Sequence, residues 1–257
     1  MTCCDRGNAV FHLKESIPMS RLQSPHGRVN SLGRIYLQNR NPHLETGKSM
    51  QSETRCFLCD VPKDLVFAES TTAFALCGLG PIMPGYSLVA TKSHVASAAD
   101  VTVTDPTFVG FAEAVRSFLG KQYGNCLLTE HGRMPACVGP AGEADPHCFH
   151  AHFLLFPAAP EVLPAARQHF SSILTSGSLA DALHTAREQA EYLLISPSSD
   201  SASILLRPGR LIPQFARMLV AQAIGKPELT NWRKAPSRPD CVQAASFLRN
   251  LDTPEAL

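Results

Sequence analysis

Two histidines set two positions apart, His150 and His152, are the residues of this chain best suited to do chemistry. They lie in residues 148–157, CFHAHFLLFP, whose apolar positions predict a β-strand. Side chains alternate between the faces of a strand, so both imidazoles are expected on one face, roughly 6.6 Å apart. Neutral imidazole is a metal ligand and a nucleophile near pH 7, and it is costly to bury without a partner. The plainer alternative is a pair of partly exposed strand histidines.

A possible set of metal ligands precedes this segment. Cys56 and Cys59 form a C-x-x-C knuckle, and His94 follows an apolar run at residues 86–91. Together with one strand histidine they make a Cys2His2 set, which tetrahedral zinc prefers. A redox pair or two buried thiols are the alternatives, but redox C-x-x-C motifs open a helix, whereas residues 60–63, DVPK, predict a turn. The sequence therefore predicts a structural zinc that ties the knuckle to the histidine strand.

The elements that must position these residues follow from the apolar pattern. Strands are predicted at residues 65–68, 74–77, 86–91, 125–129 and 149–156. Residues 106–119 carry apolar side chains at helical spacing and predict a helix that packs through its aromatic face. Strands interrupted by one long helix predict an α+β fold, with an antiparallel sheet and a helix on one face. We assign residues 53–160 to this core.

Residues 161–257 are predicted to form a C-terminal α/β extension packed on the core. Residues 179–189 predict a helix, and residues 192–195 and 203–207 predict a hairpin. Another helix is expected at residues 214–224, because Pro213 suits a helix start and Gly225 a helix end. Gln214 and Arg217 then lie three residues apart on one face of that helix.

Composition excludes several classes of protein. The chain has 257 residues, 44% hydrophobic and 18% charged, enough to bury a substantial core. A net charge of +1 predicts no nucleic-acid partner, because a duplex binder would carry a basic stripe. No apolar run approaches the roughly 20 residues that span a bilayer, and no secretory signal is evident. Nine scattered cysteines favour reduced thiols, so we expect a cytoplasmic protein without a membrane partner.

The first 50 residues differ from the rest. They contain seven basic residues (Arg6, Lys14, Arg21, Arg28, Arg34, Arg40 and Lys48) and three acidic ones (Asp5, Glu15 and Glu45). No helical or strand period persists, so residues 1–52 are interpreted as a disordered tail. An organelle transit peptide and a translation start at Met50 are the alternatives.

The order of these motifs resembles the histidine-triad (HIT) superfamily. C-x-x-C is followed by PGYSLVATKSH at residues 84–94, EHG at residues 130–132, and H-A-H ending in Pro157. In the most similar branch, the signature is H-A-H-φ-H-φ-φ-P, with E-H-G on the preceding strand. The resemblance covers residues 55–160 and continues faintly through residues 213–217 and 231–233. It implies a HIT-like fold and an activity as a nucleotide hydrolase or nucleotidyltransferase.

The resemblance also implies a role for each site residue. His152 would attack the α-phosphorus of a nucleotide and form a nucleotidyl-histidine intermediate. His150 would join Cys56, Cys59 and His94 around a structural Zn²⁺. The substrate would be a nucleotide or a dinucleoside polyphosphate, with phosphate contacts from three further side chains: His147, which precedes the strand in the loop at residues 139–147, Gln214 and Arg217. Hydrolysis and transfer share the covalent step and both stay open. A homodimer is another open implication.

Three departures from the family pattern favour a second interpretation. Leu154 stands where the third histidine is expected, and Gly78 stands where members often carry an acidic residue that binds the ribose hydroxyls. The loop at residues 139–147 matches the usual phosphate-loop pattern only loosely. The alternative function is therefore a catalytically impaired, zinc-stabilised nucleotide-binding protein. A rival alignment through Cys148, His150 and His152 would make His150 the central histidine. It is disfavoured, because Pro157 and the EHG motif then no longer match their positions in the family signature.

Overall fold

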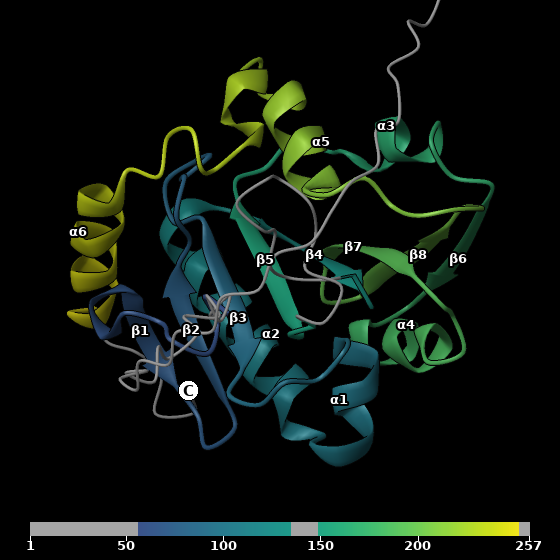
Figure 1. Ribbon diagram of the computed structural model, residues 1–257, viewed down its shortest axis with the longest axis horizontal. Coiled ribbons are helices and arrows are strands. Elements are labelled where there is room, and N and C mark those ends of the chain that lie inside the picture. Colours follow the sequence, from purple (N-terminus) through teal and green to yellow (C-terminus); the bar gives the residue numbers. More distant parts are fainter. Residues whose placement is uncertain (1–55, 135–148, 252–257) are drawn as a thin grey trace, which may run out of the picture. The chain divides into compact units, whose positions relative to one another are not determined.

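An eight-stranded antiparallel sheet forms the centre of the described protein (Figure 1). The computed structural model describes residues 56–134 and 149–251, so the predicted tail, the loop at residues 139–147 and His147 lie outside the described residues. The strands are ordered β1-β2-β3-β5-β4-β7-β8-β6. Their bounds are β1 Val66–Glu69, β2 Ala73–Cys77, β3 Ser87–Thr91, β4 Cys126–Gly132, β5 His152–Pro157, β6 Ser172–Ser176, β7 Tyr192–Ser198 and β8 Ser201–Leu206.

Helices cover both faces of this sheet (Figure 1). They are α1 Ala98–Thr104, α2 Thr107–Tyr123, α3 Leu163–Arg167, α4 Leu179–Ala186, α5 Phe215–Ala223 and α6 Arg238–Arg249, with short 3-10 helices η1 Lys63–Leu65 and η2 Pro227–Thr230. One apolar core lies beneath α1, α2 and α4 and extends to α6 at β1 and β2. A second core lies beneath α3 and α5 on the opposite face. No helix among the described residues is long and apolar enough to cross a membrane.

Strand alternation assigns the site residues to one of these two cores. On β5, Phe153 and Leu155 pack beneath α2, whereas Leu154 and Phe156 pack on the α5 side. The histidine that opens the strand, His152, therefore shares the α5 face with Leu154.

The predicted α+β class, with an antiparallel sheet and a packed helix, is confirmed. Each predicted strand and helix is present, with ends that differ by up to four residues from the prediction. The C-terminal hairpin of β7 and β8 pairs through β7 with β4, and therefore continues the sheet of the core. All described residues belong to one compact unit, Ser52–Leu257. The domain boundary near residue 160 stays a prediction.

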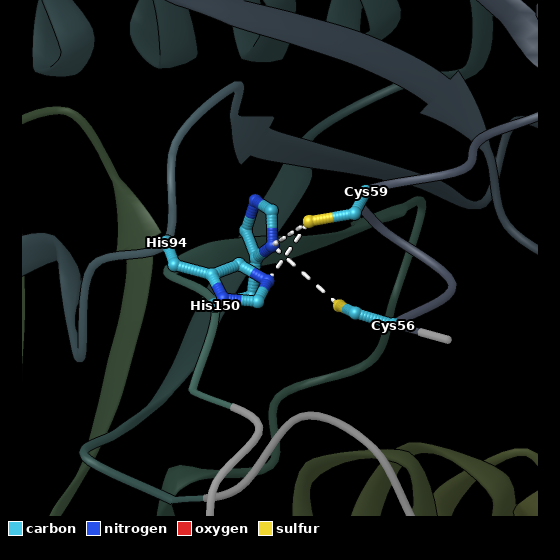
Figure 2. Close-up of side chains that lie close together, drawn as sticks. All are labelled: Cys56, Cys59, His94 and His150. Carbon is cyan, nitrogen blue, oxygen red and sulfur yellow. Dashed lines mark hydrogen bonds between the residues drawn. The ribbon is translucent and has the colours of Figure 1, made fainter. Parts of the chain in front are cut away.

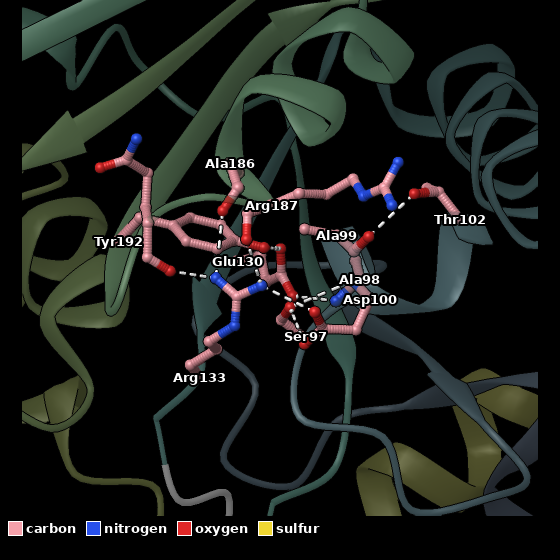
Figure 3. Close-up of polar contacts among 11 residues, drawn as sticks. Ser97, Ala98, Ala99, Asp100, Thr102, Glu130, Arg133, Ala186, Arg187 and Tyr192 are labelled. Carbon is pink, nitrogen blue, oxygen red and sulfur yellow. Dashed lines mark hydrogen bonds and ion pairs between the residues drawn. The ribbon is translucent and has the colours of Figure 1, made fainter. Parts of the chain in front are cut away.

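Two residues of the EHG motif at the end of β4, Glu130 and Gly132, have structural roles, and Figure 3 shows the contacts of Glu130. Glu130 is 1% exposed and accepts hydrogen bonds from the Ala98 amide at 2.5 Å and the Tyr192 hydroxyl at 2.7 Å. A Cβ on Gly132 would lie 2.0 Å from Cζ of Tyr192, so only glycine leaves room for that ring. The motif thus joins β4 to the start of α1 and to β7.

Arg133 extends this connection to the end of α4 (Figure 3). It adopts a left-handed backbone conformation, with φ of 57°. Its guanidinium donates to the carbonyls of Ala186, Arg187 and Gln189 and forms an ion pair with Asp100 at 2.7 Å. One side chain therefore binds the C-terminal end of α4 and the first turn of α1.

Glu130→Gln tests the buried carboxyl through the pH dependence of stability. Burial raises the pKa of Glu130 to about 7, above the unfolded value of about 4.3, so the folded state binds the proton more tightly. Its stabilising contribution is complete below pH ~4.3 and is lost as the pH rises through about 7. In urea titrations, we expect the stability of the wild type relative to Glu130→Gln to fall by on the order of 2 kcal/mol between about pH 5 and pH 8. A difference that is constant over this range contradicts the assignment.

Candidate functional site

The four predicted metal ligands lie together at the rim of the sheet (Figure 2). One ligand atom each from Cys56, Cys59, His94 and His150 lies within 4.8 Å of the others. His150 Nδ1 is 3.6 Å from Sγ of Cys56 and 3.9 Å from Sγ of Cys59, and His94 Nε2 is 2.8 Å from Sγ of Cys59. Sulfur and nitrogen ligands of a tetrahedral zinc are roughly 3.5 Å apart. This cluster could therefore hold a metal ion.

Local structure orients each ligand towards the same point. The amides of Cys59 and Asp60 donate to the Cys56 carbonyl, so the turn lies at residues 57–59, within the knuckle, rather than at the predicted residues 60–63. His150 is buried, and its Nε2–H donates to the carbonyl of Thr91 at 2.5 Å, which leaves the Nδ1 lone pair facing the thiols. Burial lowers the pKa of His150 to about 4. The ring is therefore neutral at pH 7, the form that binds metals.

The knuckle also contacts the C-terminal part of the chain. The ring of Phe57 lies 6.4 Å from that of Trp232, the only tryptophan in the sequence. Gly80 has a φ of +65°, and a Cβ there would lie 2.6 Å from Cα of Trp232. Glycine thus permits the close approach that brings Trp232 to the knuckle.

His152 is placed differently from His150. It opens β5, is half-buried, and its Nδ1 lies 2.8 Å from the carbonyl oxygen of His150. Because a carbonyl only accepts, Nδ1 carries the proton and Nε2 keeps a lone pair. Burial lowers the pKa of His152, which favours the neutral ring. Nε2 has no hydrogen-bond partner in the described ranges, so the geometry suits a nucleophile.

His131 is a site residue to which the sequence assigned no role. It is half-buried, and its Nε2 accepts a hydrogen bond from the amide of Ala216 at 3.3 Å. Its pKa is lowered to about 3 by burial and by the neighbouring His152. The signal that could have revealed it is the EHG motif, which the family signature places on the strand that precedes the histidine strand.

Arg217 is buried, with 3% of its surface exposed, and holds backbone segments together. Its Nε donates to the carbonyl of Thr230, and one terminal nitrogen donates to the carbonyls of Gly80 and Leu229. Its guanidinium lies 5.0 Å from the ring centre of Tyr86. The other terminal nitrogen is buried and has no hydrogen-bond partner among residues 56–134 and 149–251, so the predicted phosphate contact stays a prediction.

Gln214 occupies the N-cap position of α5 in a left-handed conformation, with φ of 61°, so it precedes the helix and does not share a helix face with Arg217 as predicted. Its Oε1 is buried, and no described residue offers it a hydrogen bond. It lies two residues before Ala216 and therefore close to His131. Its predicted phosphate contact is untested, as is that of His147.

Packing explains the glycine at position 78. A Cβ on Gly78 would lie 2.3 Å from the ring of Tyr86 and 2.5 Å from Leu88. The Tyr86 ring is fixed by Phe156, whose ring centre is 5.1 Å away, and by Arg217. An acidic residue at position 78 would therefore require the aromatic core to rearrange.

Comparisons with known proteins give little further information. No protein-family model matches the chain, and no curated protein matches it. Among solved structures, it is similar to a HIT-like protein involved in cell-cycle regulation from Bartonella henselae, crystallised with an unknown ligand. The identity is 20% and the TM-score is 0.26, over 38% of this chain and 70% of that one. A similarity of this size does not assign the chain to a family.

Metal removal is expected to change the fluorescence of Trp232. We expect about one zinc per chain by elemental analysis of the purified protein. Removal of the metal with a chelator, or by the substitution Cys59→Ser, is expected to free the knuckle and loosen the contact between Phe57 and Trp232. The fluorescence emission of Trp232 then shifts to the red. The matched control is Cys241→Ser, because that thiol lies outside the cluster. Folded protein that purifies without metal contradicts the assignment.

Arg217→Met separates a structural role from phosphate binding. Three carbonyls lose a charged donor, so we expect the free energy of unfolding in urea to fall by about 3 kcal/mol. The exposed Arg210 provides the control Arg210→Met, with an expected change of less than about 0.5 kcal/mol. Unchanged stability together with lost nucleotide affinity would instead support the phosphate contact.

Proposed function

We propose that this chain is a HIT-like enzyme that cleaves or transfers at the α-phosphate of a nucleotide through His152. The observation that carries the proposal is the tautomer of His152: a carbonyl holds its Nδ1–H, and its Nε2 lone pair has no partner among the described residues. The motif order from the C-x-x-C knuckle to Pro157 supports the same assignment.

The proposed chemistry has two displacements at one phosphorus atom. The Nε2 lone pair of His152 attacks the α-phosphorus, and the bond to the leaving phosphate oxygen breaks, so that this oxygen departs with the electron pair. Positive charge that develops on the ring is stabilised at Nδ1–H by the His150 carbonyl. Water or an acceptor phosphate then attacks phosphorus, and the bond to Nε2 breaks. Splitting one hard displacement into two lowers the barrier of each.

We infer that the metal is zinc and that its role is structural. Two thiols and two imidazoles form the set that zinc prefers, and none of them need contact the substrate. Holding the His150 ring also fixes the backbone carbonyl that orients His152. Loss of zinc would therefore weaken catalysis indirectly.

The proposed substrate is a nucleotide or a dinucleoside polyphosphate, with Gln214, Arg217 and His147 as proposed phosphate contacts. Hydrolysis and transfer are equally compatible with this site, because they differ only in the group that resolves the intermediate. We further propose a cytoplasmic location and no nucleic-acid partner, in line with the net charge of +1. A dimer would not form through β4, because both edges of that strand are already paired.

A zinc-stabilised binding protein without turnover is the second candidate function. Leu154 favours it, because this apolar residue replaces a polar group of the family site. Gly78 also favours it, because an acidic ribose contact has no room there.

Covalent labelling distinguishes the two functions. The protein is incubated with nucleotides and dinucleoside polyphosphates labelled at the α-phosphate, and acid-labile label on the chain is measured. If the chain is an enzyme, the label is expected on the wild type and absent from His152→Ala. It is retained in His169→Ala, a control at a histidine outside β5. No label on the wild type with any substrate, despite tight nucleotide binding, would establish the binding protein and reject catalysis.

A further inference from the structure

His131 lies beside His152 on the same face of the sheet. The antiparallel pairing of β4 with β5 ends with Thr129 opposite Leu154, and the same register continued by two residues sets His131 opposite His152. The two rings are near enough for His152 to lower the pKa of His131. Leu127 and Leu154 both belong to the core beneath α5, which identifies the face that these alternating positions share. Cross-strand neighbours have Cβ atoms about 4.5–5.5 Å apart. The two imidazoles therefore border one site.

A backbone contact sets the tautomer of His131. The amide of Ala216, in the first turn of the nine-residue α5, donates to Nε2. A neutral imidazole that accepts at Nε2 carries its proton on Nδ1. Burial keeps this ring neutral at pH 7, since it lowers the pKa to about 3. Nδ1–H has no partner in the described part of the chain and is available to a ligand.

Next to the two histidines, the polar side chain is on β4 and the apolar one is on β5. Leu154 is apolar, and its cross-strand partner Thr129 is 1% exposed, with an Oγ1 that has no partner among the described residues. An unpaired buried hydroxyl costs about 1–3 kcal/mol. A polar ligand beside His152 would therefore find its donors on β4.

We propose that His131 donates a hydrogen bond from Nδ1–H to the nucleotide phosphate that His152 attacks, and so supplies the polar contact that Leu154 lacks. This inference rests on the proposed function, because it assumes that a phosphate lies before His152. A neutral imidazole held by a helix N-terminus acts as a hydrogen-bond donor to developing negative charge, and it transfers no proton.

Two near-isosteric substitutions separate this donor from a purely structural anchor. His131→Asn keeps a donor near the position of Nδ1 and loses the acceptor for Ala216. His131→Gln keeps an acceptor near the position of Nε2 and loses the donor at Nδ1. The proposal predicts that the rate of nucleotidyl labelling falls roughly 10²-fold in His131→Gln and less than about 10-fold in His131→Asn. Thermal unfolding confirms that each variant folds.

Any other pattern of labelling rates overturns the proposed role of His131 but leaves the proposed catalysis by His152 intact. Equal rates in all three proteins, loss in both variants, or loss in His131→Asn alone would make His131 an anchor for α5. In each case the labelled wild type still supports catalysis by His152.

A measurement without substitutions covers the case in which a variant does not fold or the wild type is not labelled. Ring ¹⁵N–¹H spectra of the metal-loaded protein are recorded while the 5′-monophosphates of adenosine, guanosine, cytidine and uridine are added in turn. We expect His131 as the Nδ1–H tautomer, with a downfield shift of that proton on binding. Such a shift without covalent labelling would preserve the contact and reject turnover. An Nε2–H tautomer, or a nucleotide that shifts His152 alone, would overturn the contact, and no shift in either ring would reject both proposals.

Discussion

The hydrogen bonds of His150 are the constraint on which the rest of the site depends. Its Nε2–H is held by the Thr91 carbonyl, its Nδ1 faces the thiols of the knuckle, and its own backbone carbonyl accepts from Nδ1–H of His152. One residue thus connects the metal cluster to the candidate nucleophile. Movement of its ring or backbone would disturb both the metal cluster and His152, because hydrogen bonds weaken steeply when their distance or angle changes.

The C-terminal part of the chain completes this site through the α5 face of the sheet. The first turn of α5 fixes the ring of His131 through Ala216, and Arg217, in the same turn, binds the carbonyl of Gly80 in the core. Trp232 contacts the knuckle from the same part of the chain. At the other end, Arg133 binds the C-terminal end of α4. The extension and the core therefore pack against each other in the described part of the chain.

Periodicity and turn residues predicted the strands of the core and the long helix, because both act between neighbouring residues. The metal cluster joins residues up to 94 positions apart and was predicted from ligand chemistry and from the resemblance instead. The edge strand β6 was missed because its SILTS pattern lacks clear alternation, and α1 was missed because four of its seven residues are β-branched. The pairing of β7 with β4 is a long-range contact that no local pattern encodes. Arg217 illustrates the same limit for the site: its spacing from Gln214 gave a helix face, but not the three carbonyls that surround it.

In the proposed function, the metal cluster acts through His150 to hold His152 ready to attack phosphorus. The most direct test compares the single-turnover rate of nucleotidyl labelling in metal-loaded, metal-stripped and zinc-restored protein, with far-ultraviolet circular dichroism used to verify that the sheet persists. The account predicts a rate at least roughly tenfold lower without metal, recovered when zinc is added. Equal labelling rates in the loaded and stripped proteins would contradict it.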